Sequence, residues 1–441
     1  MRIRLCLPST AWLLMLSFLL APAPAVRADE VDPAGVSVTV GEKGLAVQSK
    51  DGRFEFELSG RVQADATLHV GDTPANTPST PGMSGVNRDP TDGTEIRRAR
   101  LAAQATVYRD WHWMGEVDFA NNEAAVKDFF LAYTGLERWK LSVGHQKQPY
   151  SLALEMSSND LPFTERSIDN ALVVAVLDRA VGVRAETHGE RWYVAGGFYG
   201  ESVEPSSENA DEGWGAAAKA VVTPILEDDR LVHLGFRGAM RRPETGNESI
   251  RFRDETTNMS DYRIVDTGAL EDVQNIFLFG PEAAFVWGPV SIFGEYNRAI
   301  LQRNGFSTVE LEGGHVGATW ALTGESWAKS YTIRTGEFKR LRPRRDFSLG
   351  GGGAGAWELA ARFAHVNLND GGPASSPDAV LGGKEQRISA SLNWYPNYNI
   401  RMMLGYEHVL QADVATASPR SVSTKEGEGL DIFTLRAQLA F

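Results

Sequence analysis

The segment Ile96–Phe119 alternates between apolar and polar residues over two consecutive stretches. If it forms two strands joined by a turn at Arg109-Asp110, one face holds only apolar or small side chains, which are Ala99, Leu101, Ala103, Ala105, Val107, Trp113, Gly115, Val117 and Phe119. The other face holds polar side chains and one methionine, which are Arg98, Arg100, Gln104, Thr106, His112, Met114, Glu116 and Asp118. A hairpin with one apolar and one charged face fits a wall between lipid and water. The segment therefore predicts part of a transmembrane β-barrel.

The same period of two recurs along most of the chain, most clearly at Phe54–Leu68. Further strands are predicted at Val126–Thr134, Trp139–His145, Val181–Thr187, Trp192–Tyr199, Trp214–Val222, Leu231–Met240, Ile276–Trp287, Val290–Ile300, His315–Leu322, Trp357–Val366, Arg387–Trp394, Ile400–His408 and Asp431–Phe441. A mean hydropathy of −0.26, and a sequence after residue 28 without any run of 18 apolar residues, argue against membrane-spanning helices. We therefore predict an all-β fold, a transmembrane antiparallel β-barrel of about 16 strands with both termini at one rim.

The first residues have the composition of an export signal. Arg2 and Arg4 precede the apolar stretch Ala11–Ala21, and Val26-Arg27-Ala28 supplies the small residues of a cleavage site. We expect a signal peptide at 1–28, a lead-in on the periplasmic side at 29–53, and the barrel at 54–441. Cys6, the only cysteine, would be removed with the signal, so the exported chain would be stabilised by its closed backbone ladder and not by disulfides.

Two long segments interrupt the strand pattern in different ways. Asp72–Gly93 is rich in Thr, Pro, Asn and Gly and predicts an outer loop. Gln146–Asp178 lacks sustained alternation, and an irregular connection of that length is usually functional. We expect this second segment to fold into the barrel.

The formal net charge is −13, and removing the three basic residues of the predicted signal leaves −16. Acidic residues gather in predicted loops at Glu201–Glu212, Asp254–Asp272 and Glu426–Asp431. Ions sense the narrowest part of a pore more than distant outer loops, because salt screens the latter. The total charge therefore does not fix which ions a pore would pass. The basic run Lys339–Arg345 lies in a predicted long periplasmic turn, where we expect solvated charge in preference to an exit site for anions.

Short motifs distributed in order along the chain resemble the phosphate-selective porin O/P family of Gram-negative outer membranes. They are Leu58-Ser-Gly-Arg-Val-Gln-Ala-Asp65, Ile96-Arg-Arg-Ala-Arg100, Tyr108-Arg-Asp-Trp111, Ala132-Tyr-Thr-Gly135, Leu231-Val-His-Leu-Gly235, Leu322-Thr-Gly-Glu325, Ala356-Trp-Glu-Leu359, Leu392-Asn-Trp-Tyr395 and a terminal Phe441. The resemblance implies a homotrimer of barrels in contact with lipid and lipopolysaccharide. It also implies a pore in each barrel narrowed by an infolded third outer loop, and delivery to the outer-membrane assembly machinery through Phe441. No cofactor and no nucleic acid is expected.

The resemblance also implies which residues form the filter. Arg61, Arg97 and Arg98 match arginines that line the constriction, Arg166 in Thr164-Glu-Arg-Ser167 matches one from the infolded loop, and Asp118 fits the acidic residue there. Arg251 and Arg253 resemble the start of an arginine ladder that leads anions inward, and an ordinary solvated loop is the equal alternative for both. A guanidinium stays charged and presents forked donors to phosphate or carboxylate oxygens.

Three positions depart from that pattern. Arg100 and Lys147 stand where phosphate-specific members carry aromatic residues, and Met156 replaces an expected lysine. We therefore predict passive, anion-preferring diffusion of phosphate or similar small anions. The alternative is a general-diffusion or small-organic-acid porin in which Glu116 and Asp118 balance the arginines. Another alternative for each wall arginine is a structural pair with a facing carboxylate, for example Arg98 with Glu116.

Two other functional classes remain open at this stage. A lipid-hydrolysing barrel would need a Ser/His pair, for which the strand histidines His112, His233, His315 and His365 are candidates, but the sequence has no Gly-x-Ser-x-Gly elbow. A structural or adhesive barrel would have its lumen plugged by Gln146–Asp178. We predict a channel and not an enzyme.

Overall fold

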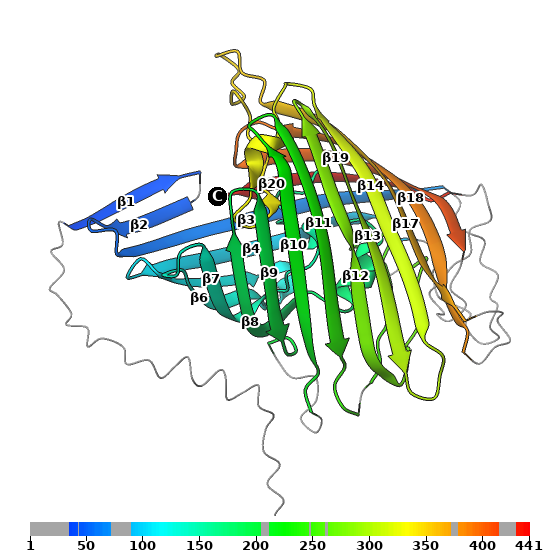
Figure 1. Ribbon diagram of the computed structural model, residues 1–441. Helices are drawn as coiled ribbons and strands as arrows, with labels where there is room; N and C mark the ends of the chain where they lie inside the picture. Colours follow the sequence, from blue (N-terminus) through cyan, green and yellow to red (C-terminus); the bar gives the residue numbers. More distant parts are fainter. Residues whose placement is uncertain are drawn as a thin grey trace, which may run out of the picture.

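The chain forms one closed, antiparallel barrel (Figure 1). The computed structural model describes residues 35–42, 44–71, 90–203, 211–246, 248–260, 263–371, 378–413 and 429–441. The predicted signal peptide and residues 72–89 of the first predicted loop lie outside these ranges. The 18-stranded sheet consists of a ring of 16 strands and an additional hairpin, β1 and β2.

The ring follows the order of the sequence. Its strands are β3 (Phe54–Val70), β4 (Gly93–Val107), β5 (Trp111–Asp118), β6 (Ala125–Tyr133), β7 (Trp139–Lys147), β8 (Arg179–His188), β9 (Trp192–Tyr199), β10 (Trp214–Leu226), β11 (Arg230–Arg242), β12 (Val273–Trp287), β13 (Val290–Arg303), β14 (Val309–Ala321), β17 (Ala356–Asp370), β18 (Val380–Tyr395), β19 (Ile400–Asp413) and β20 (Asp431–Ala440). The last strand pairs with the first over ten residues, from Asp431 opposite Val70 to Ala440 opposite Arg61. This pairing closes the barrel and leaves no open edge in the ring. The predicted fold class is confirmed.

Alternation along each strand separates a lipid face from a lumen face. In β20, for example, Phe433, Leu435 and Leu439 are exposed on the outer face, whereas Arg436 and Gln438 are buried on the inner one. Exposed aromatic side chains form a girdle at the rim that holds Phe441, and include Trp111, Trp139, Trp192, Trp287, Trp320 and Phe441. An aromatic girdle is typical of the boundary between lipid and water. We call this end the near rim and the opposite end, which carries the long loops, the far rim.

Two additional elements extend the near rim. The hairpin β1 (Val36–Gly41) and β2 (Gly44–Ser49) pairs with the start of β3, so the predicted lead-in contains two strands. The connection between β14 and β17, residues 322–355, contains the 3-10 helix η3 (Trp327–Ser330) and the short strands β15 (Tyr331–Thr332) and β16 (Glu337–Phe338). Figure 1 shows this connection in yellow beside the barrel mouth.

Among the described residues, no helix is both long and apolar enough to cross a membrane. The helices are short: α2 (Leu152–Glu155) and α3 (Asn170–Val174) both belong to the connection between β7 and β8. We call this connection, residues 148–178, the infolded loop.

Candidate pore constriction

The infolded loop lies inside the barrel, and side chains of many strands hold its backbone. Near its start, the amide of Leu152 donates to Glu282 Oε2 of β12 over 2.8 Å. Further along, Arg401 of β19 donates to the carbonyl oxygen of Leu161 over 2.7 Å, and Asn393 Nδ2 of β18 donates to that of Pro162 over 2.8 Å. The loop therefore crosses the lumen and contacts the wall on more than one side.

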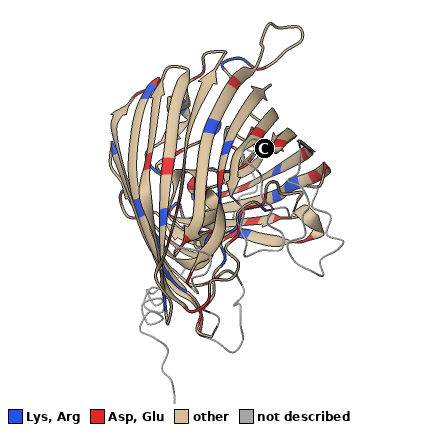
Figure 2. Ribbon diagram, turned by 90° about the vertical axis from the view of Figure 1, so that its right-hand side faces the viewer, with Lys and Arg blue, Asp and Glu red and all other residues tan. Residues whose placement is uncertain are grey.

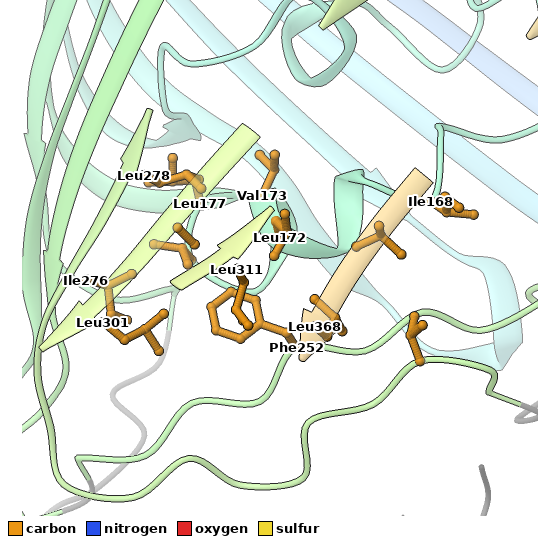
Figure 3. Packing of buried hydrophobic residues seen from close by; sticks show 14 of the residues in the cluster. Ile168, Leu172, Val173, Leu177, Phe252, Ile276, Leu278, Leu301, Leu311 and Leu368 are labelled. Carbon is orange, nitrogen blue, oxygen red and sulfur yellow. The ribbon is translucent and has the colours of Figure 1, made fainter. Parts of the chain in front are cut away.

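The second half of the loop packs against one wall through apolar residues (Figure 3). Leu172, Val173 and Leu177, in and after α3, are buried in one cluster with the inward residues Leu278, Leu301, Leu311 and Leu368 of the wall. Phe252, from the connection between β11 and β12, completes this cluster and is fully buried. Apolar burial fixes this part of the loop and fills the lumen beside β12, β13, β14 and β17.

The first half of the loop is held by buried charges. Lys219 Nζ lies 2.8 Å from Glu282 and 3.5 Å from Glu155 of α2, and Arg184 Nη2 lies 2.9 Å from Glu155. Arg237 Nη2 lies 2.9 Å from Glu295. These side chains are almost completely excluded from solvent, so each charge depends on its partner. Figure 2 shows how residues of both charge signs are distributed along the strands.

Five arginines from β3, β4 and β20 gather where the middle of the loop meets the wall. We call them the arginine cluster: Arg61, Arg97, Arg98, Arg100 and Arg436. Arg61 Nη2 donates to Glu116 over 2.7 Å and its Nη1 donates to Ser157 of the loop over 2.9 Å. Arg100 donates to Glu116 over 2.9 Å and to Asp118 over 2.6 Å.

Glu165 of the loop binds the other three arginines of the cluster. Its Oε1 accepts hydrogen bonds from Arg97 Nε over 2.9 Å, Arg98 Nη1 over 3.2 Å and Arg436 Nη2 over 2.9 Å. Its Oε2 accepts from Arg98 Nη2 over 2.9 Å. Burial alone would raise the pKa of Glu165, but the attraction of Arg98, Arg97 and Arg436 lowers it well below its usual range. Glu165 therefore stays ionised.

A β-bulge explains why the neighbours Arg97 and Arg98 both face the loop. The pairing of β3 with β4 shifts between Gln63 opposite Arg98 and Ala64 opposite Ile96, which leaves Arg97 as the extra residue. In a regular strand adjacent side chains point to opposite faces, whereas a bulge re-aims one of them. Two guanidinium groups thus reach one carboxylate from consecutive positions.

The other predicted filter residues lie in different surroundings. Arg166 donates to the backbone carbonyl oxygens of Ala153, Leu154 and Met156 at 2.6, 3.3 and 2.9 Å. Lys147 Nζ donates to the carbonyl oxygens of Glu155, over 2.9 Å, and of Met156. Both cations therefore fasten the loop to itself and to the end of β7.

Arg251 and Arg253 lie on the connection that follows β11 at the far rim, away from the cluster in sequence and on either side of the buried Phe252. Arg251 makes two hydrogen bonds to Asp266, at 2.6 and 2.5 Å, and keeps 38% of its side chain exposed.

Arg436 and its partner Glu165 were not identified from the sequence, and the pair given there as an example of a structural alternative, Arg98 with Glu116, is wrong. Arg436, which also binds Asp65 over 2.7 and 2.6 Å, sits on the polar face of the last predicted strand, and Glu165 is part of the Thr164–Ser167 motif. Arg98 binds Glu165 and Gln63, not Glu116 as suggested, because Glu116 is shared by Arg61 and Arg100.

The connection 322–355 supports the loop from the near rim. Trp327, Phe338 and Leu341 are buried together with Leu152 and Met156 of the loop. Arg340 is also buried, and its Nε lies 3.4 Å from Asp160 of the loop. The expectation of solvated charge is therefore wrong for Arg340, because this part of the connection folds against the loop, whereas Arg342, Arg344 and Arg345 of the same run are exposed.

Three of the strand histidines hydrogen bond to residues other than serine. His112 binds Thr106 and Thr134, His233 binds Glu282 and Tyr331, and His315 binds Asp169. Among the residues that the structure describes, no group of three His, Cys, Asp or Glu side chains could hold a metal ion.

The profile of the family described as phosphate-selective porin O and P matches residues 80–441. A protein of uncharacterised function from Caulobacter vibrioides is 29% identical over 390 residues, which cover 85% of this chain and 72% of that protein. Porin O of Pseudomonas aeruginosa is 23% identical over 421 residues, or 88% of this chain and 90% of the relative.

Solved porin structures share the fold. An anion-selective porin from Comamonas acidovorans superimposes with a TM-score of 0.54 at 10% identity, over 88% of this chain and 100% of that one. The outer membrane channel DcaP of Acinetobacter baumannii gives a TM-score of 0.51 at 13% identity, over 89% and 99%. Fold and family profile together place the protein in the Gram-negative outer membrane and indicate a porin channel. The chain belongs to the phosphate-selective porin O and P family.

Proposed function

We propose that this porin passes small anions such as phosphate by passive diffusion past the arginine cluster, in preference to cations. The observation that carries the proposal is the charge balance at this place. Five arginines face four carboxylates, Asp65, Glu116, Asp118 and Glu165, so the cluster has one net positive charge although the whole chain is acidic.

Arg97 is the arginine best placed to meet an ion. Its side chain is 22% exposed, compared with 11% for Arg100 and 6% for Arg98. One unit charge attracts another at 4 Å by about 1 kcal/mol in water and about 4 kcal/mol at an effective dielectric constant of 20. An attraction between these values selects an anion without trapping it.

The second candidate is a general or small-organic-acid porin on the same scaffold. The observation that favours it is that each arginine of the cluster already has a carboxylate partner. Such neutralisation leaves a small net field, which would discriminate weakly among anions. The family description and the name of the Comamonas porin support the first candidate, because both refer to anions.

The test is the zero-current potential of the purified protein in a planar bilayer under a KCl gradient. We expect a chloride-selective potential, and a shift towards zero in R97Q, which leaves four arginines against four carboxylates. R298Q is the matched control, since Arg298 pairs with Glu310 and Glu312 near the far end of β13 and does not contact the cluster. A cation-selective potential in the unmodified protein would refute the proposal.

The same proposal includes a homotrimer surrounded by lipid and lipopolysaccharide, assembled through recognition of the C-terminal strand. The exposed apolar face of β20, with Phe433, Leu435, Leu439 and the terminal Phe441, supports such recognition. Cross-linking of the folded protein in detergent tests the trimer.

A further inference from the structure

Glu165 occupies the position in the constriction where an incoming oxyanion would bind. Its carboxylate lies among three guanidinium groups and accepts charge-assisted hydrogen bonds from Arg97, Arg98 and Arg436. A free carboxylate or phosphate needs the same donors in the same forked arrangement. The loop therefore presents its own oxyanion to the filter.

Arg97 and Arg98 depend on Glu165 more than Arg436 does. In the described part of the chain, Glu165 is the only carboxylate that forms an ion pair with Arg97 or Arg98. Arg436 keeps a second carboxylate, Asp65, whose Oδ2 lies 2.6 Å from Nη2. If Glu165 moved away, two adjacent guanidinium groups would lack an anion.

Glu165 is also accessible, unlike the charges that anchor the loop. Its side chain is 34% exposed, whereas those of Glu155 and Glu282 are 6% and 0% exposed. An exposed side chain on a loop can rotate into solvent and keep its own charge hydrated, which leaves the buried Arg98 in need of another anion. The structural charges lack this freedom.

We propose that Glu165 is a tethered competitor that exchanges with the transported oxyanion at Arg97 and Arg98. The inference rests on the proposed function, since it assumes that oxyanions reach the cluster. When an anion arrives, it takes the hydrogen bonds of Glu165, and when it leaves, the carboxylate returns. Competition from a tethered carboxylate weakens the binding of the transported anion and lets it depart. Glu165 therefore sets how tightly anions bind, and the arginines determine that anions bind in preference to cations.

The experiment measures how sulfate and phosphate block the chloride current through single channels. In E165Q, Arg97 and Arg98 lose their carboxylate partner. We expect the sulfate concentration that blocks half of the current to fall about tenfold, because sulfate no longer competes with one charge-assisted hydrogen-bonding partner. Block of the chloride current by phosphate and by acetate is measured in parallel. The anion whose block strengthens more in E165Q shows whether phosphates or carboxylates are the better ligands.

Two variants distinguish competition at Arg97 and Arg98 from a general effect of removing one negative charge. E116Q removes a lumen carboxylate of equal charge. Arg100 keeps Asp118, and Arg61, which loses its carboxylate, is only 9% exposed compared with 22% for Arg97, so block by sulfate should change much less than in E165Q. E310Q removes a charge outside the lumen, where Glu310 is 45% exposed beside Arg298, and should leave block unchanged.

Equal block in E165Q and in the unmodified channel would overturn the inference, as would an equal strengthening in E116Q. If E165Q fails to fold, E165D retains the charge on a shorter side chain and should strengthen block partially. A cation-selective unmodified channel would refute the proposed function itself, whereas an anion-selective channel with unchanged block in E165Q would refute only the role of Glu165.

Discussion

Replacing Glu282 with glutamine tests how the infolded loop is held. The Glu282 carboxylate lies 2.8 Å from Lys219, 3.0 Å from His233 and 3.4 Å from Arg237, and accepts the amide hydrogen of Leu152 over 2.8 Å. The side chain is fully buried. Glutamine has nearly the same shape, so the substitution removes the charge and little packing.

The magnitude follows from the partners that remain. Breaking a buried ion pair by removing one partner costs about 3–5 kcal/mol. Lys219 keeps Glu155 at 3.5 Å and Arg237 keeps Glu295 at 2.9 Å, so we expect a loss at the lower end, about 3 kcal/mol. Because Leu152 begins α2, the first half of the loop should move away from β12 and widen the lumen.

Two measurements check this prediction. Denaturant unfolding in detergent should show the loss of stability, and single-channel recordings should show a higher conductance than that of the unmodified channel. E310Q, at an exposed position, is the control for removing one carboxylate. Unchanged unfolding together with unchanged conductance would show that the buried charges do not hold the loop.

Three further outcomes are expected. R166M loses the hydrogen bonds to the carbonyl oxygens of Ala153, Leu154 and Met156, so the infolded loop should become sensitive to protease. The zero-current potential should keep its sign. A reversed potential with an intact loop would instead indicate that Arg166 contributes to anion selection. The pKa of Glu165 lies well below its usual range, so its carboxylate stays charged as the pH falls towards about 4.3. Block by sulfate should therefore stay constant from neutral pH to that value. If block by sulfate instead strengthened with a midpoint near that pH, Glu165 would be an ordinary carboxyl group. F441A removes the terminal ring, which lies beside Gly60, and should lower the yield of folded protein in the outer membrane. The yield is measured by the heat-modifiable gel shift. A normal yield would show that the ring is dispensable for assembly.

The barrel could be predicted because its physical cause is local. Lipid on one face and water on the other impose a period of two on each strand, and a segment such as Trp192–Tyr199 has the same bounds in prediction and structure. Other predicted strands were too short at the far rim, for instance His315–Leu322 where β14 begins at Val309. Residues beyond the membrane need not alternate, so their strand character leaves little trace in the sequence.

The candidate constriction could be predicted only in part, because it depends on contacts between distant segments. Alternation places Arg98 and Arg100 on the lumen face, but it would place Arg97 on the lipid face, and the bulge that re-aims Arg97 has no two-residue signature. Which carboxylate meets which arginine depends on the path of the infolded loop. Glu165 and Arg436, which lie 271 residues apart, were therefore not recognised as partners.

The infolded loop also bridges the place where the chain closes on itself. Glu165 joins Arg97 and Arg98 of β4 to Arg436 of β20, on either side of the β3–β20 pairing. Its docking surface is therefore complete only when β20 is paired with β3. We expect a barrel whose last strand is unpaired to lack the complete arginine cluster, so that the proposed anion preference would depend on closure of the barrel.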